Sequence, residues 1–434
     1  MKQVTGISRV IIGVCFVGLF LAKGYGQEGY SLNADSTFTN MAAGEFTPGK
    51  GFQLVKSKYA SLNLSIYGMA RYLNQISSDS TYEDHLGNVK DFNGRNDIYW
   101  HRAMLWFKGF FWKPQLTYAV TVWTVTTTQQ TLVFGTLAYT FNKQMTFGVG
   151  MMPNVCIRSV QGSFPLFSST DRTMAEDGLR GGFTNGVFLT GEALPRFRYT
   201  LAYGDNLSIL GIKASNLKRH FSKSLSIEWT PTTGEFGPRG GNGDFEHHYK
   251  IATRFGASYC HSRENRFNNT GTPSPDNTQV RMSDGGLFFE TGALAPGATV
   301  IEANYDLLAV DLGFKYKGLA VHTEFYYRTL TKFSTDAPVP INSIKDKGYT
   351  AQVLYMLIPK TLCIYGINSM IIDQFERNPF EVGGGVNIYP SKTRSFRINA
   401  QATAIKKGAA GGTFGLYTTG HTGTTITIGA DILL

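Results

Sequence analysis

The chain has 434 residues, of which 41 are Lys or Arg and 31 are Asp or Glu, so its formal net charge at pH 7 is +10. Charged residues make up only 17% of the chain and aromatic residues 13%, whereas globular proteins average about 25% charged residues. These values argue against an ordinary soluble enzyme. The basic excess does not predict nucleic-acid binding, because no basic cluster stands out.

The first residues have the layout of a secretory signal peptide. Lys2 and Arg9 give a basic start, the 13 residues 10–22 form an apolar run, and small residues precede Gln27. This run is short for a membrane-spanning helix, which needs about 20 residues. We therefore expect residues 1–26 to be a cleaved signal peptide, with an uncleaved anchor as the alternative. Its removal leaves 38 basic and 31 acidic residues, a net charge of +7.

From residue 60 onward the dominant pattern is an alternation of apolar and polar residues. It is clearest in residues 62–72, 196–203, 319–328 and 396–403. A period of two over such lengths is typical of strands with one apolar and one wet face. We predict an all-β protein of about sixteen strands, covering residues 61–74, 98–111, 115–126, 131–141, 144–152, 183–193, 196–206, 221–230, 249–260, 300–316, 319–330, 347–358, 361–370, 380–389, 394–405 and 424–434.

The lengths of the predicted links favour a transmembrane antiparallel β-barrel over a soluble sandwich. Short links such as 142–143 and 317–318 alternate with long ones such as 75–97 and 261–299, with residues 127–130 and 231–248 as the exceptions. Outer-membrane barrels combine an even strand number with short periplasmic turns and long outer loops. We therefore expect residues 51–434 to form a barrel in the outer membrane, in contact with lipid and lipopolysaccharide. Residues 27–50 would form a short periplasmic extension.

Aromatic residues gather beside the short links. They are Trp112, Phe141, Trp229, Tyr316 and Tyr389. Aromatic girdles lie at the two lipid interfaces of membrane barrels. The pattern predicts such a girdle, although the core of a sandwich would explain any single member.

Several stretches resemble the phosphate-selective porin O and P family, particularly its members in Bacteroidetes-type bacteria. They are Gly51–Val55 with Leu62–Asn74, Trp229–Phe245, Lys250–Gly256 and Gly292–Gly297. The resemblance implies a sixteen-stranded, usually trimeric barrel with an inward-folded third outer loop and basic residues along the pore. It makes a homotrimer and small anionic solutes, phosphate among them, the expected partners.

The predicted third outer loop, residues 153–182, is the candidate pore constriction. It holds Arg158, Arg172 and Arg180 beside three acidic residues, and Asp171-Arg172-Thr173 resembles a step of the family's constriction loop. A basic ring at a narrow point lowers the barrier for anions, and guanidinium groups bind phosphate oxygens bidentately. The alternative is a set of solvated loop charges with acidic neighbours.

Two further arginines, Arg196 and Arg198, are predicted to point inward from a strand and to line the same pore. Arg281 falls in a different outer loop, where we expect a solvated charge.

The sequence predicts a passive porin, with a non-conducting accessory or plug barrel as the alternative. No motif supports an enzyme, and we expect no cofactor. The turn 234–243 lacks the Gly-Lys-Ser/Thr ending of a phosphate-binding loop, and His247, His248 and His261 lack metal-ligand spacing. The scattered cysteines Cys156, Cys260 and Cys363 indicate neither a disulfide framework nor a metal site.

Overall fold

The computed structural model describes residues 51–125, 130–163, 165–208, 221–237, 241–265, 280–409 and 416–434. The predicted signal peptide (1–26), the extension (27–50) and most of the predicted link 127–130 lie outside these residues. Among the described residues, helical structure is confined to a π-helical turn at Ser159–Ser163 and the short helix α3, Met174–Leu179. No described helix is long and apolar enough to cross a membrane.

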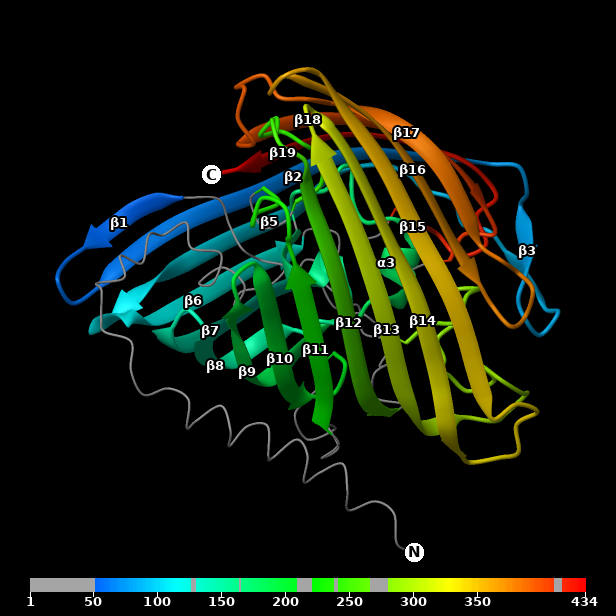
Figure 1. The fold of residues 1–434 in the computed structure, drawn as a ribbon. Helices are drawn as coiled ribbons and strands as arrows, with labels where there is room; N and C mark the ends of the chain where they lie inside the picture. Colours follow the sequence, from blue (N-terminus) through cyan, green and yellow to red (C-terminus); the bar gives the residue numbers. More distant parts are fainter. Residues whose placement is uncertain are drawn as a thin grey trace, which may run out of the picture. The chain divides into compact units, whose positions relative to one another are not determined.

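Sixteen antiparallel strands close into a barrel (Figure 1). Because each strand pairs with its neighbours in chain order and the last pairs with the first, from Gly423↔Ser77 to Leu433↔Tyr67, the sheet of the barrel has no free edge. The predicted all-β barrel is confirmed. The strands are β2 Ser61–Ser77, β5 Asn96–Phe111, β6 Lys113–Val125, β7 Gln130–Asn142, β8 Met145–Pro153, β9 Phe183–Leu194, β10 Phe197–Asp205, β11 Phe221–Trp229, β12 Ala252–Asn265, β13 Val300–Tyr316, β14 Leu319–Thr335, β15 Ser343–Ile358, β16 Leu362–Ile372, β17 Phe380–Ile388, β18 Phe396–Lys406 and β19 Gly423–Leu433.

Three shorter strands were not predicted. β1, Phe52–Lys56, pairs with residues 61–64 at the start of β2. β19 pairs with residues 67–77 on the same side of β2, and β5 pairs on the opposite side. β1 therefore lies end to end with β19 along one side of β2. β3, Thr81–Glu83, and β4, Val89–Asp91, form a small hairpin in the link between β2 and β5. Segments of three to five residues are too short to show a reliable alternation in sequence.

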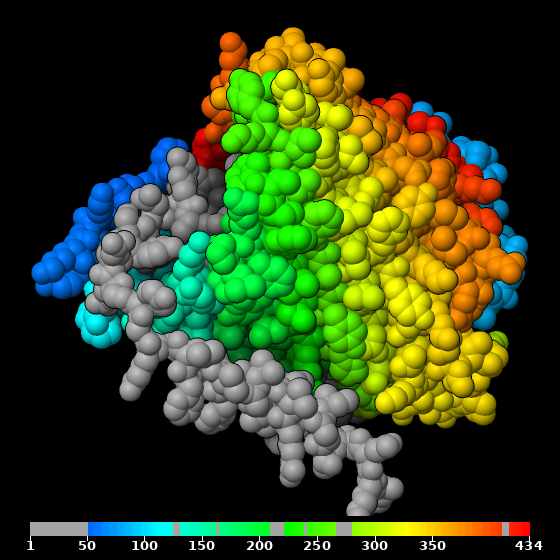
Figure 2. Space-filling model, in the orientation of Figure 1, coloured from blue at the N-terminus to red at the C-terminus, as the bar shows by residue number. Residues whose placement is uncertain are grey.

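The alternation of each strand separates a lumen face from an outer face. In β14, His322, Glu324 and Arg328 point inward and are buried, whereas Phe325 on the outer face is 52% exposed. On the side of the barrel that Figure 2 shows, the outer faces of the paired strands β12 to β15 form a continuous wall. Exposed Leu, Ile, Val and aromatic side chains on this outer face match the apolar band that faces lipid in membrane barrels.

The end of the barrel with the short links, called here the short-turn end, differs from the prediction in two details. Arg196 lies in the turn between β9 and β10 with a φ of 69°, and β10 begins one residue later. Tyr389 is buried against Phe245 of the β11–β12 link, so it does not join the exposed aromatics Trp112, Phe141 and Trp229. Sequence alternation could not reveal that this link covers Tyr389, because the contact is between distant segments.

The hydrophobic core lies inside the barrel. At the end with the long links, called the long-loop end, Ile157, Met174 and Leu179 of the β8–β9 link pack against Phe288 of the β12–β13 link and Tyr305 of the wall. The described outer links therefore fold over and into the lumen.

Candidate functional site

The β8–β9 link, residues 154–182, runs around the inner wall of the barrel and contacts strands on opposite sides. Asn154 Nδ2 donates to Ser222 Oγ of β11 at 3.2 Å, and the backbone N–H of Thr170 donates to Gln401 of β18 at 3.1 Å. The N–H of Met174 donates to Glu381 of β17 at 2.7 Å. We call this segment the inner loop. Wall side chains fix its backbone at many points, so its position in the lumen is strongly determined.

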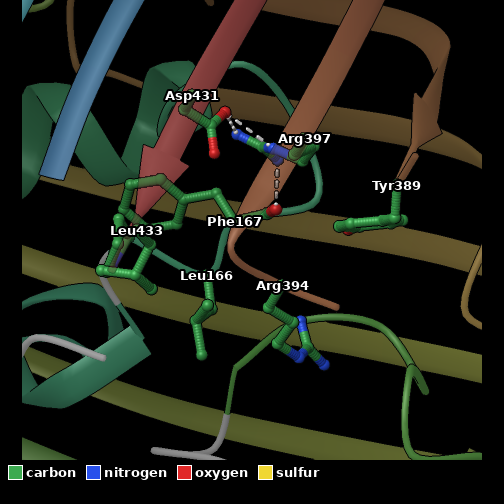
Figure 3. A pocket seen from close by; sticks show the side chains of 8 residues that line it. Leu166, Phe167, Tyr389, Arg394, Arg397, Asp431 and Leu433 are labelled. Carbon is green, nitrogen blue, oxygen red and sulfur yellow. Dashed lines mark hydrogen bonds and ion pairs between the residues drawn. The ribbon is translucent and has the colours of Figure 1, made fainter. Parts of the chain in front are cut away.

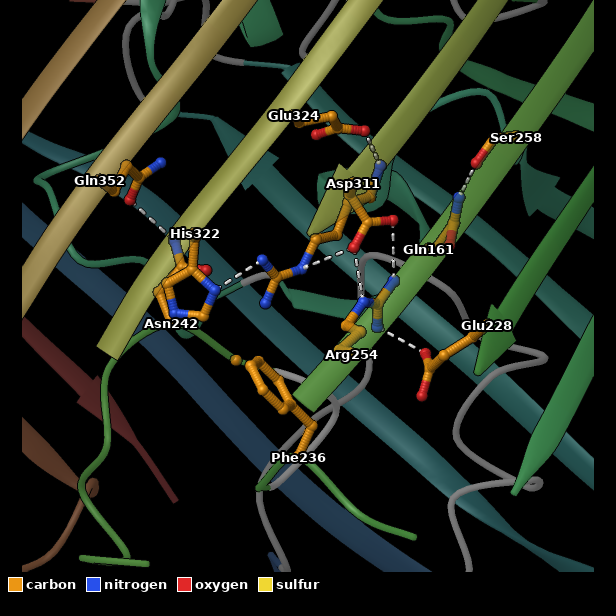
Figure 4. Close-up of polar contacts among 12 residues, drawn as sticks. Gln161, Glu228, Phe236, Asn242, Arg254, Ser258, Asp311, His322, Glu324 and Gln352 are labelled. Atoms are coloured by element: carbon orange, nitrogen blue, oxygen red, sulfur yellow. Dashed lines mark hydrogen bonds and ion pairs between the residues drawn. The ribbon is translucent and has the colours of Figure 1, made fainter. Parts of the chain in front are cut away.

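Arg158 belongs to a buried network of charged and polar side chains, whose members Arg254, Asp311, His322 and Glu324 are labelled in Figure 4. Its backbone N–H donates to Glu324 Oε1 at 2.8 Å, its Nη1 contacts His322 Nδ1 at 2.8 Å, and its Nε lies 4.0 Å from Asp311 Oδ1. Asp311 also accepts a 2.7 Å hydrogen bond from Arg254 Nε. Opposite charges thus alternate along the wall formed by β12, β13 and β14, which compensates for their desolvation.

The other two inner-loop arginines occupy different parts of the lumen. Arg172 stacks on Phe167, with its guanidinium carbon 5.3 Å from the ring centre, and its Nε donates to Ser159 Oγ at 3.2 Å. Arg180 donates to Asp177 at 3.3 Å. All three arginines are buried. The structure therefore places them in the lumen but does not gather them into a single ring.

A second segment enters the lumen from the short-turn end. In the β11–β12 link, Phe236 is buried beneath Arg158 and lies edge-on to His322, with ring centres 5.6 Å apart. The N–H of Asn242 donates to Leu166 O of the inner loop at 3.0 Å. We call residues 230–248 the inserted turn. It and the inner loop meet inside the barrel.

Lys315 of β13 holds the inserted turn in place. Its ammonium is fully buried and donates to the carbonyls of Phe236 and Gly241, both at 2.7 Å. Sequence alternation marks Lys315 as inward-facing, but no local signal indicates that its partners are backbone carbonyls of a distant turn. His322, Glu324, Asp311 and Arg254 join the site for the same tertiary reason.

The two predicted strand arginines lie near the short-turn end. Arg198 points into the lumen and donates to Glu228 at 3.0 Å. Arg196 is exposed in its turn, where its guanidinium donates to the carbonyls of Pro231 and Thr232 at 2.6 and 3.1 Å. Arg196 therefore supports the start of the inserted turn, and it does not project from the lumen face of a strand.

A pocket opens beside the inner loop at the short-turn end (Figure 3). Leu166 and Phe167 of the inner loop line it together with Arg394, Arg397 and Asp431. Arg397 donates to Asp431 at 2.8 Å and to Phe167 O at 2.7 Å. The pocket thus contains two guanidinium groups, of which Arg397 pairs with Asp431 and Arg394 with Glu246.

The Arg397–Asp431 pair should contribute strongly to stability, because both groups are buried and the pair joins β18 to β19. Removing one partner of a buried pair costs about 3–5 kcal/mol. We therefore expect R397A to lower the free energy of unfolding by this amount, measured by urea titration in lipid vesicles. R394A is the matched control: its exposed pair with Glu246 is worth about 0–1 kcal/mol. Equal losses in the two variants would contradict this.

Arg281 does not lie in a solvated loop, contrary to the expectation from sequence. It is partly buried, and its guanidinium donates to Gly285 O at 2.7 Å. Nearby, Asp284 accepts from His85 Nδ1 at 2.7 Å and from the N–H of His85 at 3.0 Å. The outer link 280–299 therefore packs against the link that contains β3 and β4.

This contact between outer links should weaken in acid. Burial alone would raise the pKa of Asp284, but hydrogen bonds from His85 and Gly286 lower it from 3.8 to about 2. A carboxyl with a depressed folded-state pKa stabilises the fold above its unfolded pKa and loses that effect as the pH falls through the folded value. Pepsin cleavage in residues 81–91 should therefore increase between about pH 4 and pH 2. D284N should already be cleaved at pH 4, and equal resistance of both proteins would contradict the assignment.

In the described parts of the chain, no group of three or more His, Cys, Asp or Glu side chains is placed to hold a metal ion.

The fold, but no sequence family, can be matched to known proteins. No protein-family model and no curated protein sequence matches the chain. Among solved structures, OmpT of Vibrio cholerae is 12% identical with a TM-score of 0.53, and the match covers 88% of this chain and 99% of that one.

Two further solved structures are similar. An anion-selective porin from Comamonas acidovorans is 8% identical with a TM-score of 0.52, covering 86% of this chain and 100% of that one. OmpF of Salmonella typhi, in complex with daunomycin, is 11% identical with a TM-score of 0.50, covering 88% and 100%. Identities this low establish the fold alone. The chain therefore folds as an outer-membrane β-barrel of the porin type.

Proposed function

We propose that this barrel is an outer-membrane porin through which small hydrophilic solutes diffuse passively, with a preference for anions, phosphate among them. The short-turn end then faces the periplasm and the inner loop is the constriction loop. The observation that carries the proposal is the position of Arg158, Arg172 and Arg180 in the lumen of a sixteen-stranded barrel. Fixed positive charge at a narrow point lowers the barrier for anions. Passive diffusion requires no catalytic group.

Two features support an anion preference over a neutral pore. The pocket at the short-turn end brings the guanidinium groups of Arg394 and Arg397 to one mouth of the lumen. The mature chain would also carry a net charge of +7. Low-dielectric walls strengthen the effect of such charges on a passing ion. The resemblance to the porin family further implies that the barrel acts as a homotrimer.

Planar-bilayer recording in a KCl gradient tests this function directly. We expect stepwise currents and a zero-current potential whose sign shows that chloride is more permeant than potassium. A zero-current potential of the opposite sign, which shows that potassium is more permeant than chloride, would contradict the anion preference. An unheated sample on SDS gels should migrate as a trimer, and migration as a monomer would contradict the assembly.

One observation favours the alternative, a non-conducting plug or accessory barrel. The inner loop and the inserted turn meet inside the lumen through Asn242 and Leu166, and the side chains around this contact are buried. If vesicles contain folded, protease-resistant protein while the bilayer carries no current, this alternative replaces the porin.

A further inference from the structure

Two of the three cysteines outside the predicted signal peptide come together in the folded barrel. Cys156, in the inner loop, and Cys260, in β12, are both 0% exposed and belong to the same core cluster. Both are free thiols in this structure, and each lies near enough to the other to influence it electrostatically. The sequence separates them by about 100 residues, so spacing could not suggest the pairing.

The path of the inner loop explains why these thiols meet. Asn154 is anchored to Ser222 of β11, and Gln161 donates its side-chain amide to Ser258 of β12. Cys156 lies between these two anchors, and Cys260 follows Ser258 by two residues on the same face of β12. The N–H of Gly181, at the far end of the loop, donates to Cys156 Sγ at 2.9 Å. Cys156 thus marks the point where both ends of the inner loop meet the wall.

We propose that Cys156 and Cys260 form a disulfide in the exported protein, which fastens the inner loop to β12. The inference goes beyond the proposed function and needs only that the chain folds in an oxidising compartment, where disulfides persist. It revises the expectation from cysteine spacing alone.

The bond would form by thiol–disulfide exchange during folding, while the loop is still accessible. One cysteine thiolate attacks a disulfide of the oxidant, forms a mixed disulfide and releases one thiol of the oxidant. The second cysteine thiolate then attacks the protein-side sulfur and releases the second thiol. The two cysteine protons end on the oxidant's thiols, and the protein loses two electrons to the oxidant. Once folded, the bond is shielded from solvent.

Cys363 provides an internal control. It lies on β16, away from this contact, and its thiol approaches the carbonyl of Ile364 at 3.5 Å. Trypsin would place the three cysteines on separate peptides, residues 144–158, 255–263 and 361–377. A linked pair can therefore be assigned without ambiguity by mass spectrometry.

The experiment uses protein purified from the outer membrane and, in parallel, protein refolded with oxidised glutathione. Each is denatured without reductant, treated with N-ethylmaleimide and digested. We expect peptides 144–158 and 255–263 to be joined and only Cys363 to be alkylated. The C363S variant should keep the link, whereas C156S should free Cys260 for alkylation. Reductant added to the folded barrel should leave the link intact, but reductant added after denaturation should release it.

Buried cysteines also serve as small apolar side chains. If all three cysteines are alkylated in both preparations, or if Cys363 takes part in the link, the proposal is wrong. This result does not depend on conductance. Failure of the disulfide and failure of the porin function can therefore be told apart.

Discussion

Replacing residues 234–243 with three glycines should raise the single-channel conductance severalfold. The change removes Phe236 from beneath Arg158 and Asn242 from its contact with Leu166. It also frees Lys315, whose ammonium now binds two carbonyls of the inserted turn. The lumen would then be wider and carry an additional exposed positive charge. Planar-bilayer recording of the variant measures both the conductance and the ion preference.

Point variants show whether a higher conductance comes from a wider lumen or from a general disturbance of the barrel. F236A removes only the buried ring, so it should raise conductance in the same direction but less. E235Q changes an exposed neighbour and keeps an acceptor for His248, so its conductance should match the wild type. If the glycine replacement folds into a heat-modifiable barrel with unchanged conductance, the inserted turn does not limit the channel.

Replacing Arg158 with Gln should shift the ion preference toward cations. Arg158 is the inner-loop cation that lies closest to Asp311 and Glu324 of the wall, so loss of its positive charge makes this part of the lumen more negative. A unit charge about 8 Å away at an effective dielectric constant of about 20 is worth about 2 kcal/mol. We therefore expect the ratio of anion to cation permeability to fall by about an order of magnitude, measured from the zero-current potential.

Two controls accompany this variant. R158K keeps the charge, so it should retain most of the anion preference. K332Q removes a positive charge from the exposed outer end of β14, where salt screens it within about 8 Å. Its zero-current potential should not change. Equal shifts in R158Q and K332Q would place the selectivity outside the constriction and make the pocket beside Arg394 and Arg397 the next candidate.

The sequence determined the barrel, because each strand carries its own lipid face and lumen face. Alternation alone identified the strands that carry Arg71, His322 and Arg397, and the link lengths alone distinguished the two ends. These are local properties, because the side chains of a strand alternate between its two faces with a period of two residues. The pattern can therefore be recognised in the strand's own sequence, without its neighbours. The strand number was predicted correctly for the same reason.

The filling of the lumen depends on tertiary contacts. The inserted turn at Phe236, the carbonyl partners of Lys315 and the meeting of Cys156 with Cys260 each join segments that are far apart in sequence. Tyr389 was misplaced because a distant link covers it, and Arg281 because its own link folds back on its guanidinium. The alternation of a strand indicates the face on which each residue lies. The partner of that residue in the lumen depends on the path that an irregular link takes through the lumen. No repeat in the sequence encodes that position.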